Sequence, residues 1–417
     1  MAIDNKDKMV LKSSIEREQN EVACSAECEK IKGSKNLNVP HLRFPEFSEE
    51  WEICKVSELL DFYSTNSLSW EQLEYGTKAI MNLHYGIIHV GLPTMVDLTR
   101  DNLPNIKEDN MPKNFELCKE GDVAFADASE DTNEVAKPIE FFDLAGKNIV
   151  CGLHTIHGRD NKNKTVIGFK GYAFSSSAFH NQIRRIAQGT KIYSISTKNF
   201  SECFIGIPSK VEQTKIATLL RLIDERIATQ NKIIEKLQSL IRGLAVTLTT
   251  KGNFNTAISQ CLECHSSTLQ ESEVLPNGLY KVFGANGLVG YTDVPQMNGD
   301  AILVIKDGSG VGTVSYAQGK FSAIGTLNYL TVIDNNDLRY LYFALSVFNF
   351  QAYKTGMAIP HIYFKDYGKA KIYCPPLAEQ KHIANVLDKL ESKLLLEQGI
   401  LASFNWQKRY LLGQMLI

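Results

Sequence analysis

Cysteines and histidines at short spacing are the side chains in this sequence most able to do chemistry. Cys261 and Cys264 flank two residues and His265 follows directly, which is the spacing of c-type haem attachment. A second pair, His154 and His157, is three residues apart. Haem attachment requires export. A structural zinc site needs four ligands, and no second pair of cysteines or histidines lies at zinc-finger spacing. We therefore expect no metal site and no haem.

Three other patterns resemble enzyme motifs without completing one. The glycines of residues 308–312 follow a strand-like run, but the β-type residues after them provide no helix N-terminus for a pyrophosphate, so a hairpin turn is expected. Residues 283–287 resemble the glycine motif of adenosylmethionine enzymes, yet the Asp/Asn-Pro-Pro-aromatic tetrapeptide of amino-methyltransferases is absent. Glu391 and Lys393 have nuclease-like spacing but fall within a heptad pattern. We expect no catalytic residues in this chain.

An internal repeat organises the chain. Residues 189–248 align without a gap on residues 356–415, at a constant offset of 167. The identical pairs include Gly189/Gly356, Ile192/Ile359, Ile195/Ile362, Lys198/Lys365, Pro208/Pro375, Glu212/Glu379 and Gln213/Gln380. In both copies the apolar residues then recur at steps of three and four, broken at the equivalent polar positions Gln230 and Glu397. This heptad spacing predicts two long helices, which we expect to pair antiparallel.

Each predicted helix follows a region of short β-type runs, glycines and aromatic residues. We therefore expect an α+β fold with an internal pseudo-twofold repeat, in which two globular domains are separated by two long antiparallel coiled-coil helices. The expected segments are a polar N-terminal extension (1–38), a first globular domain (39–207), a first spacer helix (208–250), a second globular domain (251–375) and a second spacer helix (376–417). A helix of ~35 residues would be ~50 Å long.

Composition excludes several classes of protein. The 45 Lys+Arg nearly balance 47 Asp+Glu and 44% of residues are hydrophobic, which argues against wholesale disorder and against a uniformly basic nucleic-acid binder. No run of 18 apolar residues occurs, and the N-terminal residues lack the apolar core of a signal peptide. The nine cysteines are spread along the chain. We expect a cytoplasmic protein with reduced thiols.

Positive charge is concentrated in the repeated parts of the sequence. Residues 161–216 carry nine bases against two acids, and residues 339–372 carry five bases against one acid. A solvated basic face is the alternative, but recurrence in both halves favours contact with nucleic-acid phosphates. The expected phosphate contacts are Arg184, Arg185, Lys191, Lys198, Lys354 and Lys365. The expected base-edge contacts, on loops flanking strands, are Asn82, Ser129, Thr132, Asn133, Asn286, Lys306, Ser309 and His361.

These features resemble one known family, the specificity subunit of type I restriction–modification systems. The resemblance rests on the opening VPHLRFPEF of residues 39–47 with Trp51, on the Pro…Glu-Gln…Ile-Ala start of each helix, and on residues 280–291. Two features depart from the family pattern: the long segment before Val39, and the absence of an RFPEF-like start in the second half. The first leaves the role of that segment open, and the second leaves open where the second domain begins.

The resemblance implies a function and a set of partners. Each globular domain would be a target-recognition domain that reads one half of a bipartite DNA site, and the helices would set the gap between the halves. The subunit would have no cofactor of its own. It would bind two methyltransferase subunits, which use adenosylmethionine on adenine, and two restriction/translocase subunits that need ATP and Mg²⁺ can join them. The alternatives are a stand-alone adenosylmethionine-dependent DNA methyltransferase and a coiled-coil adaptor without DNA binding.

Overall fold

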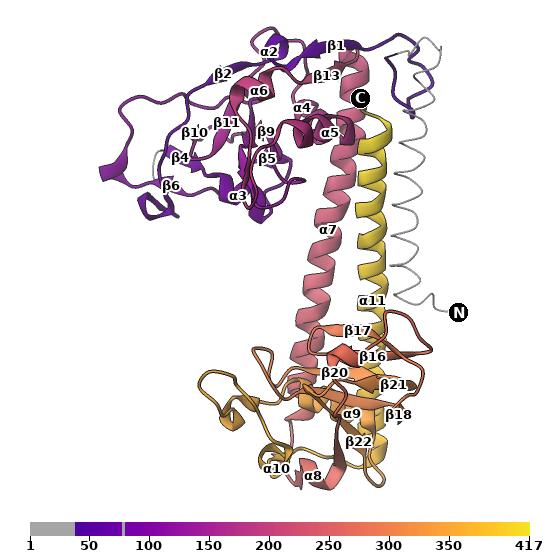
Figure 1. The fold of residues 1–417 in the computed structure, drawn as a ribbon. Helices are drawn as coiled ribbons and strands as arrows, with labels where there is room; N and C mark the ends of the chain where they lie inside the picture. The colour runs from indigo at the N-terminus through magenta and orange to yellow at the C-terminus, as the bar shows by residue number, and fades with distance from the viewer. Residues whose placement is uncertain (1–37, 77–79) are drawn as a thin grey trace. The chain divides into compact units, whose positions relative to one another are not determined.

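The computed structural model describes residues 38–76 and 80–417 (Figure 1). The predicted N-terminal extension, apart from Asn38, lies outside these residues. The described chain forms two compact units: the first ends at Arg226 and is completed by Phe404–Ile417, and the second is Ile227–Ser403. Within the described residues, no helix combines the length and apolar character needed to cross a lipid bilayer.

Two larger sheets build the first unit. A five-stranded sheet has the order β2-β11-β7-β9-β5, and a four-stranded sheet has the order β10-β4-β6-β3. The five strands are β2 (Asp61–Tyr63), β11 (Thr155–Arg159), β7 (Val123–Ala126), β9 (Pro138–Asp143) and β5 (Met95–Asp97). The four are β10 (Asn148–Cys151), β4 (Ile80–Leu83), β6 (Asn105–Ile106) and β3 (Leu73–Glu74). Both sheets are mixed, because β5 is parallel to β9 and β10 is parallel to β4.

Short helices and two small ribbons complete the first unit. The ribbons are antiparallel: β1 (Glu52–Lys55) pairs with β13 (Phe204–Ile207), and β8 (Ala128–Ser129) pairs with β12 (Tyr193–Ser194). The helices are α2 (Val56–Leu59), α3 (Tyr85–Val90), α4 (Lys170–Phe174), α5 (Ser177–Ile186) and α6 (Thr197–Ser201), with single 3₁₀ turns at Trp70–Gln72 and Glu108–Asn110. Ser176 and Ser196 cap α5 and α6 by accepting backbone N–H groups. The edge-to-face rings of Phe125, Phe174 and Phe179 pack β7 against α4 and α5.

The second unit also contains two four-stranded sheets, with the orders β15-β22-β19-β20 and β17-β16-β21-β18. Their strands are β15 (Leu262–Ser266), β22 (Leu327–Val332), β19 (Ala301–Ile305), β20 (Val314–Ala317), β17 (Gly287–Thr292), β16 (Tyr280–Gly284), β21 (Lys320–Ala323) and β18 (Met297–Asn298). A short ribbon joins β14 (Thr256–Ala257) to β23 (Lys371–Ile372). The helices are α8 (Ile258–Cys261), α9 (Leu338–Ser346) and α10 (Phe364–Tyr367), with 3₁₀ turns η3 (Glu271–Glu273) and η4 (Phe350–Tyr353). β19 and β20 are antiparallel, which confirms the predicted hairpin at residues 308–312.

Two long helices run through both units: α7 (Lys210–Thr249) and α11 (Leu377–Gln414). In the first unit, Lys408 Nζ lies 2.6 Å from Asp224 Oδ1, and the backbone N–H of Gly206 bonds to the carbonyl of Ile417. In the second unit, Gln230 contacts Glu397. In the second unit Ala245 also packs in one core cluster with Ile383 and Leu387, so the residue numbers rise along α7 as they fall along α11 and the helices pair antiparallel. The predicted fold class is confirmed.

The same glutamine holds the start of each long helix. Gln213 donates from Nε2 to the carbonyl of Pro208 at 2.9 Å, and Gln380 donates to the carbonyl of Pro375 at 2.8 Å. Each side-chain oxygen also accepts a backbone N–H from its own globular domain. These bonds satisfy fully buried amides, which explains why the Glu-Gln pair recurs at the offset of 167.

The glutamate before each of these glutamines is paired with a cation. The carboxylate of Glu212 accepts two hydrogen bonds of 2.7 Å from the Arg43 guanidinium. Arg43 is the arginine of the RFPEF motif. The second half lacks this motif, and there Lys251 Nζ lies 2.5 Å from Glu379. A different cation thus takes the same place, so the missing motif leaves the helix start intact.

Candidate nucleic-acid interface

Each unit carries a tight hairpin that only glycine permits. Gly189 has φ +142° and Gly356 has φ +88°. A Cβ at Gly189 would overlap the carbonyl oxygen of Ile192, and a Cβ at Gly356 would overlap that of Ile359. Since these residues are equivalent in the repeat, the two units fold the hairpin in the same way.

The pairing of the hairpin ends is also equivalent. An antiparallel bridge joins Gln188 to Ser194 in the first unit, and another joins Thr355 to His361 in the second, at the same offset of 167. The basic residues that flank these hairpins were predicted from sequence to contact phosphates. The repeat therefore supplies one matching surface element to each unit.

In the first unit, the hairpin docks beside the predicted base-reading loop. β12 pairs with β8, which places Tyr193 opposite Ser129. From α5, Arg184 Nη1 donates to Asn133 Oδ1 at 2.8 Å. Lys191 is exposed within the hairpin. The structure thus brings Ser129, Thr132, Asn133, Arg184 and Lys191 into one region of the unit.

The loop itself is held by short-range bonds. Ser129 Oγ accepts the backbone N–H of Asp131 at 3.1 Å, and Asp131 accepts both the backbone and the side-chain N–H of Asn133. Such Asx-type bonds fix the loop without burying it. Arg185, on α5, and Lys198, on α6, are exposed on neighbouring helices.

In the second unit, four predicted residues come together around the equivalent hairpin. Lys306 and Ser309 lie in the β19–β20 turn, and the backbone of Lys306 accepts the N–H of Ile362 at 2.9 Å. Asp307 forms an antiparallel bridge with His361. Ser309 and Lys354 line the same surface hollow, between that turn and η4. Lys306, Ser309, Lys354 and His361 therefore form one surface.

The two units differ in the residue that accepts a backbone hydrogen bond from the hairpin. Ile195 donates its backbone N–H to the backbone carbonyl of Asp127 at 2.9 Å, whereas the equivalent Ile362 donates to the backbone carbonyl of Lys306 at 2.9 Å. Asp127 also bonds to a ring nitrogen of His154 at 3.1 Å, and burial raises the pKa of its carboxyl.

Besides Arg185 and Lys198, three predicted residues lie outside these groups. Asn82 was expected on a loop, and this location is wrong: it lies in β4, is fully buried, and donates to Asn66 Oδ1 at 3.0 Å. That bond satisfies its Nδ2, whereas its Oδ1 is buried without a hydrogen-bond partner. Asn286 is exposed in the β16–β17 turn, in the other sheet of the second unit. Lys365 is exposed on α10, with Nζ 5.1 Å from the ring centre of Tyr363.

A cluster of aromatic and imidazole rings in the first unit was not found from the sequence. It comprises Trp70, His84, Tyr85, His89 and His154, with neighbouring ring centres 4.6–6.0 Å apart. His89 bonds to the carbonyl of Ala128 at 2.9 Å and so reaches the predicted base-reading loop. Burial lowers the pKa of His84. The rings come from segments up to 84 residues apart, and the only sequence signal was the local His-Tyr pair at 84–85.

The cysteine motif does not form a site with its histidine. Cys261 ends α8, and His265 lies on β15, where it stacks on Tyr329 and bonds to Thr331. His154 and His157 also diverge, since His154 is half exposed and His157 is fully buried. Among the described residues, one group does bring the ligand atoms of three cysteine and histidine side chains within 4.8 Å of one another: Cys118, Cys151 and His157.

A family model and two curated proteins match this chain. The model is described as the type I restriction modification DNA specificity domain and matches residues 262–404. The specificity subunit of type I restriction enzyme EcoprrI from Escherichia coli is 25% identical over 114 residues, which are 27% of this chain and 28% of that protein. A protein of Methanocaldococcus jannaschii, assigned as the MjaX specificity subunit, is 25% identical over 222 residues, which are 53% of this chain and 50% of that protein. The matches thus span half or less of each relative.

Solved structures share the fold over most of the chain. The type I restriction–modification S subunit from M. genitalium superposes with a TM-score of 0.58 and 18% identity, covering 91% of this chain and 99% of that one. A chain from a study of assembly and conformational transition of the type I system gives 0.54 at 14% identity, covering 89% and 98%. The specificity-domain match over residues 262–404, the two relatives and the shared fold show that this chain is similar to specificity subunits of type I restriction–modification systems.

Proposed function

We propose that this chain recognises a bipartite double-stranded DNA sequence and directs methyltransferase and restriction subunits to it. The observation that carries the proposal is the repeated hairpin: at equivalent positions, each unit docks a glycine hairpin with flanking basic residues onto a loop that follows a buried strand. Lysine and arginine supply sequence-independent affinity for phosphates, and polar side chains on such loops read base edges.

The proposed division of labour follows the repeat. Residues 39–207 and 251–375 act as target-recognition domains, and residues 208–250 and 376–417 act as spacer helices that set the unspecified gap. At 1.5 Å per residue, the 40 residues of α7 span ~60 Å, which corresponds to ~18 base pairs at 3.4 Å per pair, before docking geometry is considered. The antiparallel pairing in each unit supports helices that are rigid enough for this role.

The proposed contacts fall into two classes. Arg184, Arg185, Lys191, Lys198, Lys354 and Lys365 bind phosphates, and Ser129, Thr132, Asn133, Asn286, Lys306, Ser309 and His361 read bases. Asn82 is buried, so it supports β4 rather than contacting a base. Tyr85, His89 and His154 join the first reading surface, because His89 contacts the loop that carries Ser129.

The chain has no catalytic role in this proposal and acts in the cytoplasm, with the genome. Two methyltransferase subunits supply adenosylmethionine chemistry on adenine, and two restriction/translocase subunits that use ATP and Mg²⁺ complete the nuclease. Purified alone with adenosylmethionine and DNA, the chain should transfer no methyl group. Methyl transfer by the isolated chain would instead support the stand-alone methyltransferase.

Salt-dependent DNA binding tests the proposed surface. Lys191→Ala and Lys354→Ala should each weaken binding to duplex DNA and reduce the slope of log affinity against log salt by about 1. Lys113→Ala is the matched control, since Lys113 is exposed in an acidic stretch of the first unit. Unchanged affinity in both variants would favour an adaptor that does not bind DNA.

A further inference from the structure

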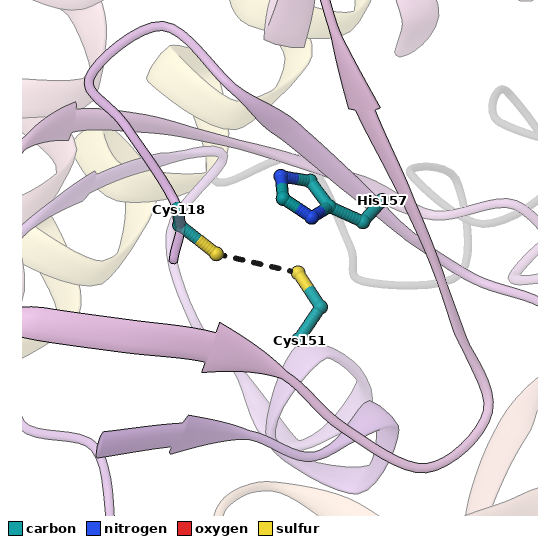
Figure 2. A group of neighbouring side chains, drawn as sticks. All are labelled: Cys118, Cys151 and His157. Carbon is teal, nitrogen blue, oxygen red and sulfur yellow. Dashed lines mark hydrogen bonds between the residues drawn. The ribbon is translucent and has the colours of Figure 1, made fainter. Parts of the chain in front are cut away.

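Three potential metal ligands meet inside the first unit, at residues that DNA recognition does not use (Figure 2). Cys118 lies in the loop before β7, Cys151 ends β10, and His157 lies in the centre of β11. The two Sγ atoms are 3.6 Å apart, and all three ligand atoms lie within 4.8 Å of one another. All three residues are buried, and the His157 side chain has 0% exposure.

One imidazole nitrogen of this group has no partner. His157 Nε2 lies 2.7 Å from Asp122 Oδ2, whereas its Nδ1 is buried without a hydrogen bond. In Figure 2 the imidazole ring lies beside the two sulfur atoms. A buried polar atom without a partner is costly, so an unoccupied lone pair here calls for an explanation.

The surroundings of His157 are those of a histidine that binds a metal. Such a histidine binds the metal through one ring nitrogen and donates the other N–H to a carboxylate, which fixes its tautomer and orientation. Asp122 is that carboxylate, and Arg159 holds it with two hydrogen bonds of 2.8 Å. The ring is therefore oriented before any ion is present.

The sulfur separation fits a shared ion. Two thiolates at about 2.3 Å from a tetrahedral Zn²⁺ lie about 3.8 Å apart, close to the 3.6 Å between Cys118 and Cys151. Thiolate is a soft ligand and imidazole is a borderline one, and this combination favours Zn²⁺ and Cu⁺ over Mg²⁺ or Ca²⁺.

We propose that Cys118, Cys151 and His157 bind one thiophilic metal ion, Zn²⁺ or Cu⁺. On binding, each thiol loses its proton to solvent, two metal–sulfur bonds and one metal–nitrogen bond form, and no atom changes oxidation state. Two thiolates neutralise Zn²⁺, so the buried site gains no net charge. Three protein ligands complete a trigonal Cu⁺ site and leave one position of tetrahedral Zn²⁺ to a non-protein ligand.

The ion would join the two sheets of the first unit. Cys151 belongs to β10 of the four-stranded sheet, and His157 belongs to β11 of the five-stranded sheet. The connection between these strands carries His154, part of the ring cluster beside the reading loop. The proposal replaces the sequence-based expectation of no metal site, which considered only ligands at short spacing.

Metal titration of the reduced full-length chain tests the proposal. The chain is stripped with chelator, then incubated separately with Zn²⁺ and with Cu⁺ under anaerobic conditions, and bound metal is measured after gel filtration. We expect one ion per chain with at least one of the two metals and a raised thermal midpoint. Cobalt substitution should give a thiolate charge-transfer band. The two arms identify which metal is bound.

Variants assign the ligands. Cys151→Ser and His157→Gln should lower metal affinity at least tenfold, whereas Cys203→Ser, a buried thiol of the same unit outside the group, should keep it. If the ligand variants do not fold, the stoichiometry and the cobalt band of the unmodified chain still decide the question. Absence of bound metal in both arms, or a Cys118–Cys151 disulfide in the protein purified without reductant, would overturn the proposal.

Discussion

Gln230 donates from Nε2 to the backbone carbonyl of Glu397 at 3.0 Å, and these two residues occupy the same position in the two halves of the repeat. A residue that contacts its own repeat equivalent lies where the two helices are related by a local twofold axis. Both residues are buried in an otherwise apolar seam, with 6% and 7% of their surface exposed. A buried polar pair of this kind fixes the register of paired helices at some cost in stability.

Replacing both residues should loosen the register of the two helices while it stabilises their pairing. The double variant Gln230→Leu with Glu397→Leu should raise the denaturant midpoint of the second unit, because apolar side chains then fill the seam. The same variant should accept DNA sites with a wider range of gap lengths. Gln230→Leu alone should lower the midpoint, because it removes a partner of a buried carboxylate. A double variant that keeps a single gap length would show that other contacts set the register.

The same carboxylate makes the helix pair sensitive to acid. Hydrogen bonds from Lys393 and Gln230 hold the pKa of Glu397 below its ordinary value of 4.5. A lowered carboxyl pKa contributes stability that is present above pH 4.5 and is lost as the pH falls through the folded-state pKa. Glu397→Gln should therefore reduce the loss of stability between neutral and acidic pH, measured as denaturant midpoints. Glu235→Gln, at an exposed site on α7, is the control and should leave the pH profile unchanged.

A buried ion pair in the first unit should be strongly coupled. Lys170 Nζ lies 3.1 Å from Glu140 Oε1, and both side chains are at most 3% exposed. Burial raises the pKa of Glu140, although Lys170 and two backbone N–H groups oppose this. Glu140→Gln should cost about 3–5 kcal/mol of unfolding free energy, because it leaves a buried ammonium unpaired.

The double variant of this pair provides the check. Glu140→Gln with Lys170→Met should recover most of the loss, since no unpaired charge then remains. Chemical denaturation of the two single variants and the double variant gives the coupling energy. Additive losses would contradict a direct interaction between the two side chains.

The hairpin glycines should be irreplaceable in both units. Gly189→Ala and Gly356→Ala should each destabilise the chain by about 1–3 kcal/mol and weaken DNA binding, because a side chain at positive φ would also overlap a backbone carbonyl. Gly243→Ala is the matched control: its Cβ would have open space within α7, so the helix should be stabilised by about 0.5–1 kcal/mol. Equal effects at the three positions would contradict the hairpin argument.

The long helices and the features that recur in both copies of the repeat could be predicted from the sequence. The heptad spacing predicted both long helices, and the offset of 167 aligned the hairpins, the anchoring glutamines and the Gln230–Glu397 contact. These features depend on side chains that are close in sequence, or on two copies that can be compared. The same signal explains why the basic residues near both hairpins were found.

Contacts between distant strands could not be predicted. Asn82 lies in a strand whose parallel partner, β10, begins 66 residues later, so its burial left no local pattern. Cys118, Cys151 and His157 are likewise assembled by three separate segments, and only the folded sheets bring them together. Short-range motifs therefore drew attention to Cys261 and His265, which the fold separates.

We propose that two reading domains and a helical spacer define a bipartite DNA site. Mapping methylated adenines across the host genome, with this gene present and deleted, tests it most directly. We expect a methylated motif of two short specified halves with a fixed unspecified gap, and we expect this motif to be lost on deletion of the gene. An unchanged methylation pattern, or a motif without a gap, would contradict it.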